Sequence, residues 1–487
     1  MTQLIGGEML HWSDLSGTHG PAPLTAALAG PLLAGLPGRV LVAGPHDPAA
    51  LPAGATVLVR GVADAEALDG RGLTVWCGSL EKMAAEPAFD AVVALDGLGR
   101  LCTPEAPDLS WPETLGLLLA VLKPGGRLVL GVPNDFGLDR LLALPPSPAD
   151  TDWVTPDGPV TPADLHPRLA AAGFPVVREY AAYPGALLGA EVLADPGLRG
   201  FLGATLTAAT SAGLVAAATS AAATSAATRP AQPRLADPDL LITGALRHGL
   251  AAQLAPGWIL LAGDLAAGPA AALPSGPMRL DGGVWLQADG TPIPAGRTLE
   301  DLVLAACGRR ALPVVRELLT AWQDSPAAGV PAGQVVVDAA GTCHGLGQAS
   351  TPVSALRSLA AALIRGGYAH LWPSPADEAE LTALLAGMTG RELDPHAVPA
   401  AGPGPDAGSI RELLVERDRL AQELADARAG HEFYERTIAS RDAELKRVRQ
   451  MNALLSATVP GKAATTLVGG LKAGRRAVRA VVKRARD

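Results

Sequence analysis

Three apolar stretches decide the fold of this chain: GRVLVAGPHD at residues 38–47, FDAVVALD at 89–96 and LKPGGRLVL at 122–130. Each holds a short aliphatic run bounded by glycine, proline or aspartate, which is typical of a buried strand. A helical stretch at 111–122 precedes the third run, and its LKPGG sequence supplies the turn from helix to strand. Apolar runs that alternate with helices predict an open parallel sheet covered on both faces.

Further strands and helices extend this pattern on both sides of the three runs. The predicted fold class is therefore α/β, with a doubly wound, Rossmann-like sheet. Strands are expected at 39–43, 55–60, 73–77, 89–95, 127–132 and 174–183, a seventh is a candidate at 186–193, and helices are expected at 64–68, 111–122 and 161–172.

The order of these elements, the Phe89-Asp90 pair and the LKPGGRL turn together resemble the class I S-adenosylmethionine-dependent methyltransferases. The resemblance covers roughly residues 39–192. It implies S-adenosylmethionine as cofactor, bound at the carboxyl ends of the first four strands, where ligands of open α/β sheets lie. No metal is implied.

The residues that this family uses to hold its cofactor are mostly replaced here. The family ends its first strand in an acid and a glycine-rich turn; Val42 stands at the acidic position, Gly44 is retained, and His46 and Pro48 replace two glycines. The resemblance assigns the cofactor site as a whole to Val42, Ala43, Gly44, Pro45, Arg60, Gly61, Ser79, Leu80 and Asp96. Arg60-Gly61 stands where the family places an acid for the ribose, so the site is either remodelled or lost.

Three residues near the expected carboxyl edge are catalytic candidates. His46 is a candidate general base with a pKa suited to neutral pH, or else an exposed loop residue. Asp96 is a candidate to accept a proton or to fix the acceptor, or else it caps the following loop. Asn134 either orients a substrate through its amide, or forms a turn. The sequence after the fifth strand, GVPNDFGL at 131–138, resembles the methyltransferase subset encoded with polysaccharide and cell-envelope glycosyltransferases.

The rest of the chain divides into further segments. We expect an N-terminal lead-in at 1–37, the methyltransferase-like domain at 38–199, and an Ala/Thr/Ser-rich linker at 200–234. An accessory α/β domain follows at 235–396, then a Pro/Gly linker at 397–408. The accessory domain has a hairpin-like VVVDAAG run at 335–341, but no lysine occurs between Lys123 and Lys446. The missing lysine disfavours an active kinase and favours a structural or acceptor-binding domain.

The C-terminal region is charged and helical. Residues 409–458 give a heptad pattern with Ile410 at position a, and this predicts either a homo-oligomeric coiled coil or a solvated helix that packs on its own protein. Residues 462–487 hold eight Lys/Arg and one Asp, whereas the whole chain has a formal net charge of −9. A basic amphipathic helix there favours an anionic membrane surface, with a solvated tail as the alternative. Nucleic acid is disfavoured because no aromatic residue interleaves the charges.

Two functions stay open from the sequence. The first is methyl transfer to a sugar or related acceptor in cell-envelope glycan assembly. The second is a catalytically degenerate adaptor that tethers partner enzymes through its coiled coil and tail. The four scattered cysteines and the absence of a signal-peptide pattern predict a cytoplasmic protein, attached peripherally to the membrane if the tail binds there.

Overall fold

The computed structural model describes residues 2–16, 24–84, 86–142, 158–159, 161–210, 235–266, 268–372, 377–398 and 410–457. The chain divides into two compact units, Met1–Leu413 and Leu414–Asp487. Most of the predicted Ala/Thr/Ser-rich linker, nearly all of the Pro/Gly linker and the whole basic tail lie outside the described residues.

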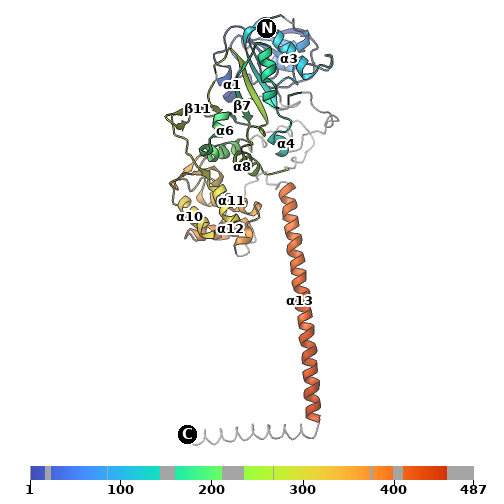
Figure 1. The fold of residues 1–487 in the computed structure, drawn as a ribbon, viewed down its shortest axis with the longest axis vertical. Coiled ribbons are helices and arrows are strands. Elements are labelled where there is room, and N and C mark those ends of the chain that lie inside the picture. The colour runs from blue at the N-terminus through green and yellow to red at the C-terminus, as the bar shows by residue number, and fades with distance from the viewer. Residues whose placement is uncertain are drawn as a thin grey trace. The chain divides into compact units, whose positions relative to one another are not determined.

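A twelve-stranded mixed sheet forms the centre of the first unit (Figure 1). Its spatial order is β1-β4-β3-β2-β5-β6-β9-β7-β8-β10-β11-β12. The strands are β1 (Thr2–Gly6), β2 (Val40–Ala43), β3 (Thr56–Val59), β4 (Thr74–Gly78), β5 (Phe89–Ala94), β6 (Leu122–Pro133), β7 (Val176–Tyr183), β8 (Ala186–Gly189), β9 (Gly257–Gly263), β10 (Ala271–Leu273), β11 (Gly276–Asp281) and β12 (Val284–Leu286).

The strands from β1 to β6 are parallel and form the predicted core of the sheet. Counted from β2, the neighbours β4-β3-β2-β5-β6 follow the order 3-2-1-4-5 of a doubly wound nucleotide-binding sheet. The order reverses between β2 and β5, where Val42 pairs with Val93. The prediction of a Rossmann-like parallel core is therefore confirmed.

Helices cover both faces of this core, as double winding requires. The helices α1 (Ala26–Leu33) and α2 (Val62–Leu68) contribute apolar side chains to the core on one face. The helices α3 (Trp111–Ala120) and α5 (His166–Ala171) do so on the other, and Figure 1 shows α1 and α3 on opposite sides. Alternate residues of β2 enter the two cores, Val40 and Val42 in one, Leu41 and Ala43 in the other.

The antiparallel half of the sheet corrects the predicted domain boundaries. β9 lies between β6 and β7 and is antiparallel to both, although it comes from the region assigned to the accessory domain. Its sequence, GWILLAG, is buried on both faces, which suits a central strand. The candidate seventh strand at 186–193 is instead the short strand β8, followed by the helix α6 (Ala190–Ala194). The sheet therefore extends through β12, beyond the predicted boundary at residue 199.

The N-terminal segment also belongs to the sheet rather than to a separate lead-in. β1 pairs in parallel with β4 and adds a strand at the sheet edge. Residues 7–16 then continue past the ends of β4 and β3, and Met9 forms an isolated bridge with Gly61. The predicted lead-in at 1–37 thus contributes both a strand and a cover over the sheet.

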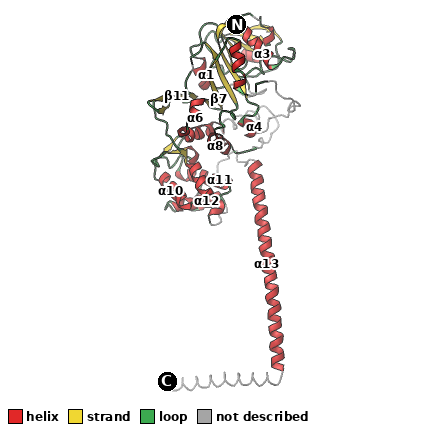
Figure 2. Ribbon diagram, in the orientation of Figure 1, coloured by secondary structure: helices red, strands yellow, loops and turns green. Residues whose placement is uncertain are grey.

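The remaining described part of the first unit is mainly helical. A three-stranded sheet, β13 (Arg297–Thr298), β14 (Val335–Val337) and β15 (Cys343–Gly345), packs with helices around the buried Trp322. Figure 2 shows α10, α11 and α12 gathered together. The helices described here are α8 (Pro238–His248), α9 (Leu299–Gly308), α10 (Leu312–Gln323), α11 (Pro352–Arg365) and α12 (Glu378–Met388). The short helix α4 (Leu138–Leu142) follows β6.

The second unit contains the greater part of a single long helix, α13 (Ile410–Ala457). The helix matches the segment predicted as helical, while its association with another helix remains a prediction. Among the described residues, no helix combines the length and apolar character that a membrane crossing needs.

Candidate functional site

The candidate site is the carboxyl edge of the parallel strands at the point where the strand order reverses. In open α/β sheets the crevice outside this edge is where ligands bind, because the connections from the two central strands diverge there. β2 ends at Ala43 and β5 at Ala94, so the residues that follow them border the crevice. The sequence assigned most of its cofactor and catalytic candidates to this edge.

Gly44, the retained glycine, lies at the centre of the edge but is covered. Its φ of +89° is in the left-handed region that favours glycine, and its N–H donates to the Leu58 carbonyl. A Cβ added here would lie 3.2 Å from Cδ2 of Leu101. Leu101 is fully buried and belongs to the apolar core, together with Ala43. An apolar side chain of the protein itself therefore occupies the space over Gly44.

His46 connects the two central strands across the crevice. Its Nδ1 lies 3.1 Å from the Gly44 carbonyl oxygen, and its Nε2 accepts the Leu95 N–H at 3.2 Å. We assign the proton to Nδ1 because Nε2 faces a donor. Burial of the imidazole lowers the pKa of His46 to about 4. The expectation of a pKa suited to neutral pH was wrong, since His46 is a buried, neutral bridge with both nitrogens engaged.

Arg60, at the end of β3, binds the N-terminal segment. Its Nε and Nη2 donate to the two carboxylate oxygens of Asp14 at 2.7 and 2.9 Å, a bidentate pair. Its Nη1 donates to the Cys102 carbonyl at 3.1 Å, and its guanidinium lies 5.4 Å from the Trp12 ring centre. A Cβ on the adjacent Gly61 would collide with the Trp12 carbonyl oxygen, so glycine is required there.

Asp96 forms a second ion pair beside the first. Arg100, four residues later, donates to Asp96 through Nε at 2.5 Å and also through Nη2. Nη1 of Arg100 lies 3.8 Å from Asp14. The side chains of Asp14, Arg60, Asp96 and Arg100 are each at most 12% exposed. Two carboxylates and two guanidiniums therefore form a balanced, nearly buried network on this edge.

The two carboxylates of this network titrate differently. Burial alone would raise the pKa of Asp14, but hydrogen bonds from Arg60 and Trp12 and the charges of Arg60 and Arg100 outweigh it, so the pKa is lowered. Burial raises the pKa of Asp96, and the hydrogen bond and charge of Arg100 offset only part of that effect. Asp14 is thus the carboxylate that the network stabilises in its charged form.

Ser79 and Leu80 hold the loop that carries Leu101. The Leu80 N–H donates to the Leu101 carbonyl at 2.9 Å, and the Ser79 hydroxyl oxygen accepts the Thr103 N–H at 3.0 Å. The Ser79 hydroxyl itself donates to Glu81. These two positions, assigned to the cofactor from the sequence, instead fasten residues 98–103 against the end of β4.

Asn134 lies at the end of β6 and is also fully engaged. Its Nδ2 donates to the carbonyls of Gln253 and Ala255 at 2.8 and 2.7 Å, and its Oδ1 accepts the Phe136 N–H at 3.0 Å. Asn134 is buried, and it joins the end of β6 to the segment that enters β9. This geometry corresponds to the turn-forming alternative.

The residues at this edge do not fit S-adenosylmethionine. A cofactor over Gly44 would meet Leu101, and no acid replaces Val42 at the end of β2 for the ammonium group. At the end of β3 the ribose hydroxyls would meet Arg60, whose donors already bind Asp14 and Cys102. Val42, Ala43, Gly44 and Pro45 are all buried. The edge is closed by the chain itself.

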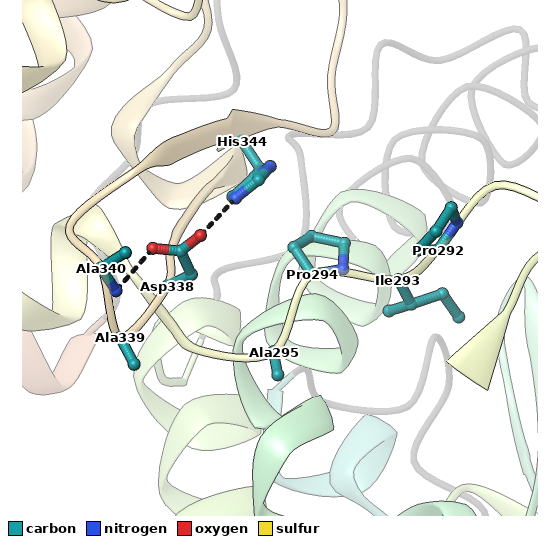
Figure 3. A pocket seen from close by; sticks show the side chains of 8 residues that line it. All are labelled: Pro292, Ile293, Pro294, Ala295, Asp338, Ala339, Ala340 and His344. Carbon is teal, nitrogen blue, oxygen red and sulfur yellow. Dashed lines mark hydrogen bonds and ion pairs between the residues drawn. The ribbon is translucent and has the colours of Figure 1, made fainter. Parts of the chain in front are cut away.

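A cavity of about 440 Å³ lies away from this edge, beside the three-stranded sheet (Figure 3). Asp338 and His344 line one side, with His344 Nε2 2.9 Å from Asp338 Oδ2. The other Asp338 oxygen accepts the N–H groups of Ala340 and Thr342, each at 2.9 Å. These bonds, first that from His344, lower the pKa of Asp338. They are the contacts of a capped hairpin turn.

Comparisons with known proteins find only distant structural likenesses. No protein-family model matches the sequence, and no curated protein matches it. Similar solved structures include a sarcosine dimethylglycine methyltransferase, described as putative, from Galdieria sulphuraria (11% identity, TM-score 0.25, 46% of this chain and 78% of that chain). Another is an S-adenosylmethionine-dependent methyltransferase from Geobacter sulfurreducens with bound S-adenosyl-L-homocysteine (14%, 0.24, 46% and 84%).

A cyclopropane synthase from Mycobacterium tuberculosis is also similar (14% identity, TM-score 0.27, 49% of this chain and 82% of that chain). These likenesses are too distant to carry a cofactor or an activity over to this chain. The strand order of the parallel core is itself that of a Rossmann-like, doubly wound sheet.

Sequence reasoning located the edge but missed the groups that close it. Asp14 and Trp12 come from the segment regarded as a lead-in, and Arg100 and Leu101 from a loop that carried no motif. One signal was available: Arg60 follows a fully apolar strand, and a cation at a buried edge requires an anionic partner.

We expect the Asp14–Arg60 pair to be essential for stability. Asp14→Ala should lower the free energy of unfolding by about 3–5 kcal/mol, because it leaves two nearly buried guanidiniums without their shared carboxylate. The Arg60→Ala variant should be similarly destabilised, and the double variant less than the sum of the two. Urea denaturation followed by circular dichroism measures these differences.

Asp264→Ala provides the matched control, because Asp264 is 87% exposed and pairs with Arg127 at the surface. It should cost at most about 1 kcal/mol. Equal effects of Asp14→Ala and Asp264→Ala would show that the network does not hold the N-terminal segment in place.

His46 should lower the free energy of unfolding as the pH decreases from about 6.5 to 4. Its folded-state pKa of about 4 lies below the unfolded value of 6.5, so below pH 6.5 the unfolded chain takes up the proton first. The resulting loss grows to about 3 kcal/mol by pH 4. Urea denaturation between pH 7.5 and 4 should give a steeper pH dependence for the native chain than for His46→Gln.

His166→Gln is the control for this measurement, because His166 is 46% exposed and pairs with Glu179. Its effect on the pH dependence should be far smaller than that of His46→Gln, because a surface ion pair contributes at most about 1 kcal/mol. If His46→Gln retained the full dependence as well, a buried neutral imidazole at this position would be wrong.

Proposed function

We propose that the chain is a catalytically degenerate adaptor built on a methyltransferase-like fold. In this proposal the sheet serves as a folded body, α13 associates with another helix, and the basic tail attaches the assembly to an anionic membrane surface. The observation that carries the proposal is the closed edge: Leu101 over Gly44, His46 bridging the central strands, and the Asp14–Arg60 pair at the end of β3.

The energetics of opening that edge support the same conclusion. A ligand over Gly44 would have to displace Leu101, and exposing a buried leucine costs about 1.5–3 kcal/mol. Moving its loop would also break the bond from Arg60 to Cys102 and those from Leu80 and Thr103. Such costs are subtracted from whatever affinity the ligand gains.

The second candidate is S-adenosylmethionine-dependent methyl transfer to a sugar or other acceptor of envelope glycan assembly. The strand order 3-2-1-4-5 and the retained Gly44 favour it. The glycan acceptor rests only on the resemblance of residues 131–138, and fold-level resemblance is a weak basis for function. This candidate requires the loop at 98–103 to leave the edge.

Calorimetric titration with S-adenosylmethionine and S-adenosylhomocysteine distinguishes the two candidates. If the chain is an adaptor, we expect no saturable heat, because the crevice is filled. In addition, the ammonium group of the ligand has no carboxylate partner, and each missing charged hydrogen bond weakens binding by about 1.5–3 kcal/mol. Submicromolar binding would overturn the proposal.

If heat does appear, a pair of variants locates it. Asp96→Asn alters an acid at the edge, whereas Asp264→Asn alters an exposed acid at the far end of β9. Binding weakened by the first and not by the second would favour the methyl-transfer candidate. Binding insensitive to both would count against this edge as the cofactor site.

We expect the tail to bind anionic membranes. Deleting residues 462–487 should reduce cosedimentation with phosphatidylserine-containing vesicles, since each basic residue near the surface contributes about 1 kcal/mol. Added salt should reduce the binding of the full chain. A full-length variant with Lys472, Arg476, Arg479 and Lys483 changed to Gln separates charge from length.

Equal binding of the native chain to neutral and anionic vesicles would contradict the electrostatic account. If the tail bound neither kind of vesicle, the membrane part of the adaptor proposal would fail, whereas the argument from the closed edge would be unaffected.

A further inference from the structure

The long helix α13 carries apolar side chains that the described part of the chain leaves in solvent. The helix has 48 residues, and at 1.5 Å per residue it is about 72 Å long. An apolar row on so long a helix is stabilised by burial against a partner. The side chains in question, each more than half exposed, are Leu420, Leu424, Tyr434, Ile438, Leu445 and Val448.

These six side chains follow a heptad spacing, whereas Phe433, Met451 and Leu454, which are also more than half exposed, lie at other heptad positions. With Leu424, Ile438 and Leu445 at position a, Leu420 and Val448 fall at position d. Alternating a and d positions form one seam along a helix, and the seam packs knobs into holes against a second helix. The face is therefore shaped for another helix rather than for a globular surface.

We propose that the partner of this seam is a second copy of the chain, aligned parallel and in register. The inference rests on the proposed function, of which association through α13 is a part, and adds the orientation and register of the pair. Charge complementarity between the positions that flank the seam carries it.

In a parallel pair each g residue lies opposite the e residue five positions later on the partner helix. Glu423 at g then faces Arg428 of the second copy, and Glu444 at g faces Arg449. Both copies contribute the same pairs, so each contact occurs twice. The other described g–e combinations contain no like charges: Gly430 with Glu435, Thr437 with Asp442.

An antiparallel pair would place g against g and e against e instead. The described g positions are Glu423, Gly430, Thr437, Glu444 and Met451. None is basic, so this contact gains no attractive pair and brings glutamates together in some alignments. The charged residues at the described e positions are Arg428, Glu435, Asp442 and Arg449, and no single antiparallel alignment gives all four of them an opposite partner. In the parallel pair both described g glutamates face an arginine, so the flanking charges favour the parallel arrangement.

Polar residues within the seam favour a single register. Asn452 lies at position a, and an asparagine there pairs with its own counterpart only when two parallel helices are in register. Arg417 and His431, also at a, cost stability wherever they are paired. We therefore expect a reversible rather than a very tight dimer.

Disulfide trapping in the full-length chain tests orientation and register. Asn452→Cys should crosslink readily under mild oxidation, because a and a′ face each other in a parallel, in-register pair. Ala443→Cys, at the outward position f, is the matched control and should not. The unsubstituted chain controls for its own thiols: Cys77 and Cys307 are buried, Cys102 and Cys343 partly so.

Charge variants test the flanking pairs by sedimentation equilibrium. Glu423→Lys with Glu444→Lys turns every described g–e attraction into repulsion, and should raise the dimer dissociation constant roughly tenfold or more. Adding Arg428→Glu and Arg449→Glu reverses both sides and should restore it. In an antiparallel pair the lysines would still face lysines at g, so the restoration would not follow from these contacts.

The outcomes separate the two levels of the proposal. A dimer that crosslinks at residue 452 and not at 443 supports the parallel pair. A dimer with equal or no crosslinking at the two positions overturns the parallel, in-register arrangement and leaves association through α13 standing. A full-length chain that sediments as a monomer at every concentration overturns both.

Discussion

Arg60 is the residue on which the closed edge depends. A guanidinium presents five donors in one plane, so a single side chain can bind groups on two sides. Here it binds Asp14 from the N-terminal segment and the Cys102 carbonyl from the loop after β5. Its own carbonyl also accepts the Met9 N–H. Two segments far apart in sequence are thereby held against the end of β3, where the resembled family would carry an acid for its cofactor.

The presence of Arg60, where the resembled family carries an acid, also explains why the crevice is filled rather than empty. An arginine at a buried edge costs free energy unless a carboxylate approaches it, and Asp14 of the N-terminal segment is the carboxylate that pairs with Arg60. Arg100 then lies close to both Asp14 and Asp96. In the loop between Asp96 and Thr103, Leu101 packs into the apolar core. The ion pairs of Arg60 and Arg100 and the side chain of Leu101 together close the carboxyl edge of the sheet.

The sequence predicted the parallel core well, because β2, β5 and β6 are uninterrupted apolar runs. They also follow one another in the sheet in the same order as along the chain. It could not place β9: an antiparallel strand inserted from a distant segment has no local signal beyond its own hydrophobicity. The candidate residues Gly44, Arg60, Ser79 and Asp96 do meet at one edge. Their partners Asp14 and Leu101 depend on long-range packing, which spacing and composition do not record.

In the adaptor proposal the surfaces that bind partners lie on α13 and the tail rather than on the sheet. In a parallel pair, chain connectivity puts residue 410 of both helices at one end and residue 457 at the other. The two basic tails, each following residue 457, would then start side by side. Two linked weak membrane contacts act as one stronger contact, because binding of the first raises the effective concentration of the second. Parallel pairing would therefore make a modest tail sufficient, whereas an antiparallel pair would separate the tails by the length of the helix.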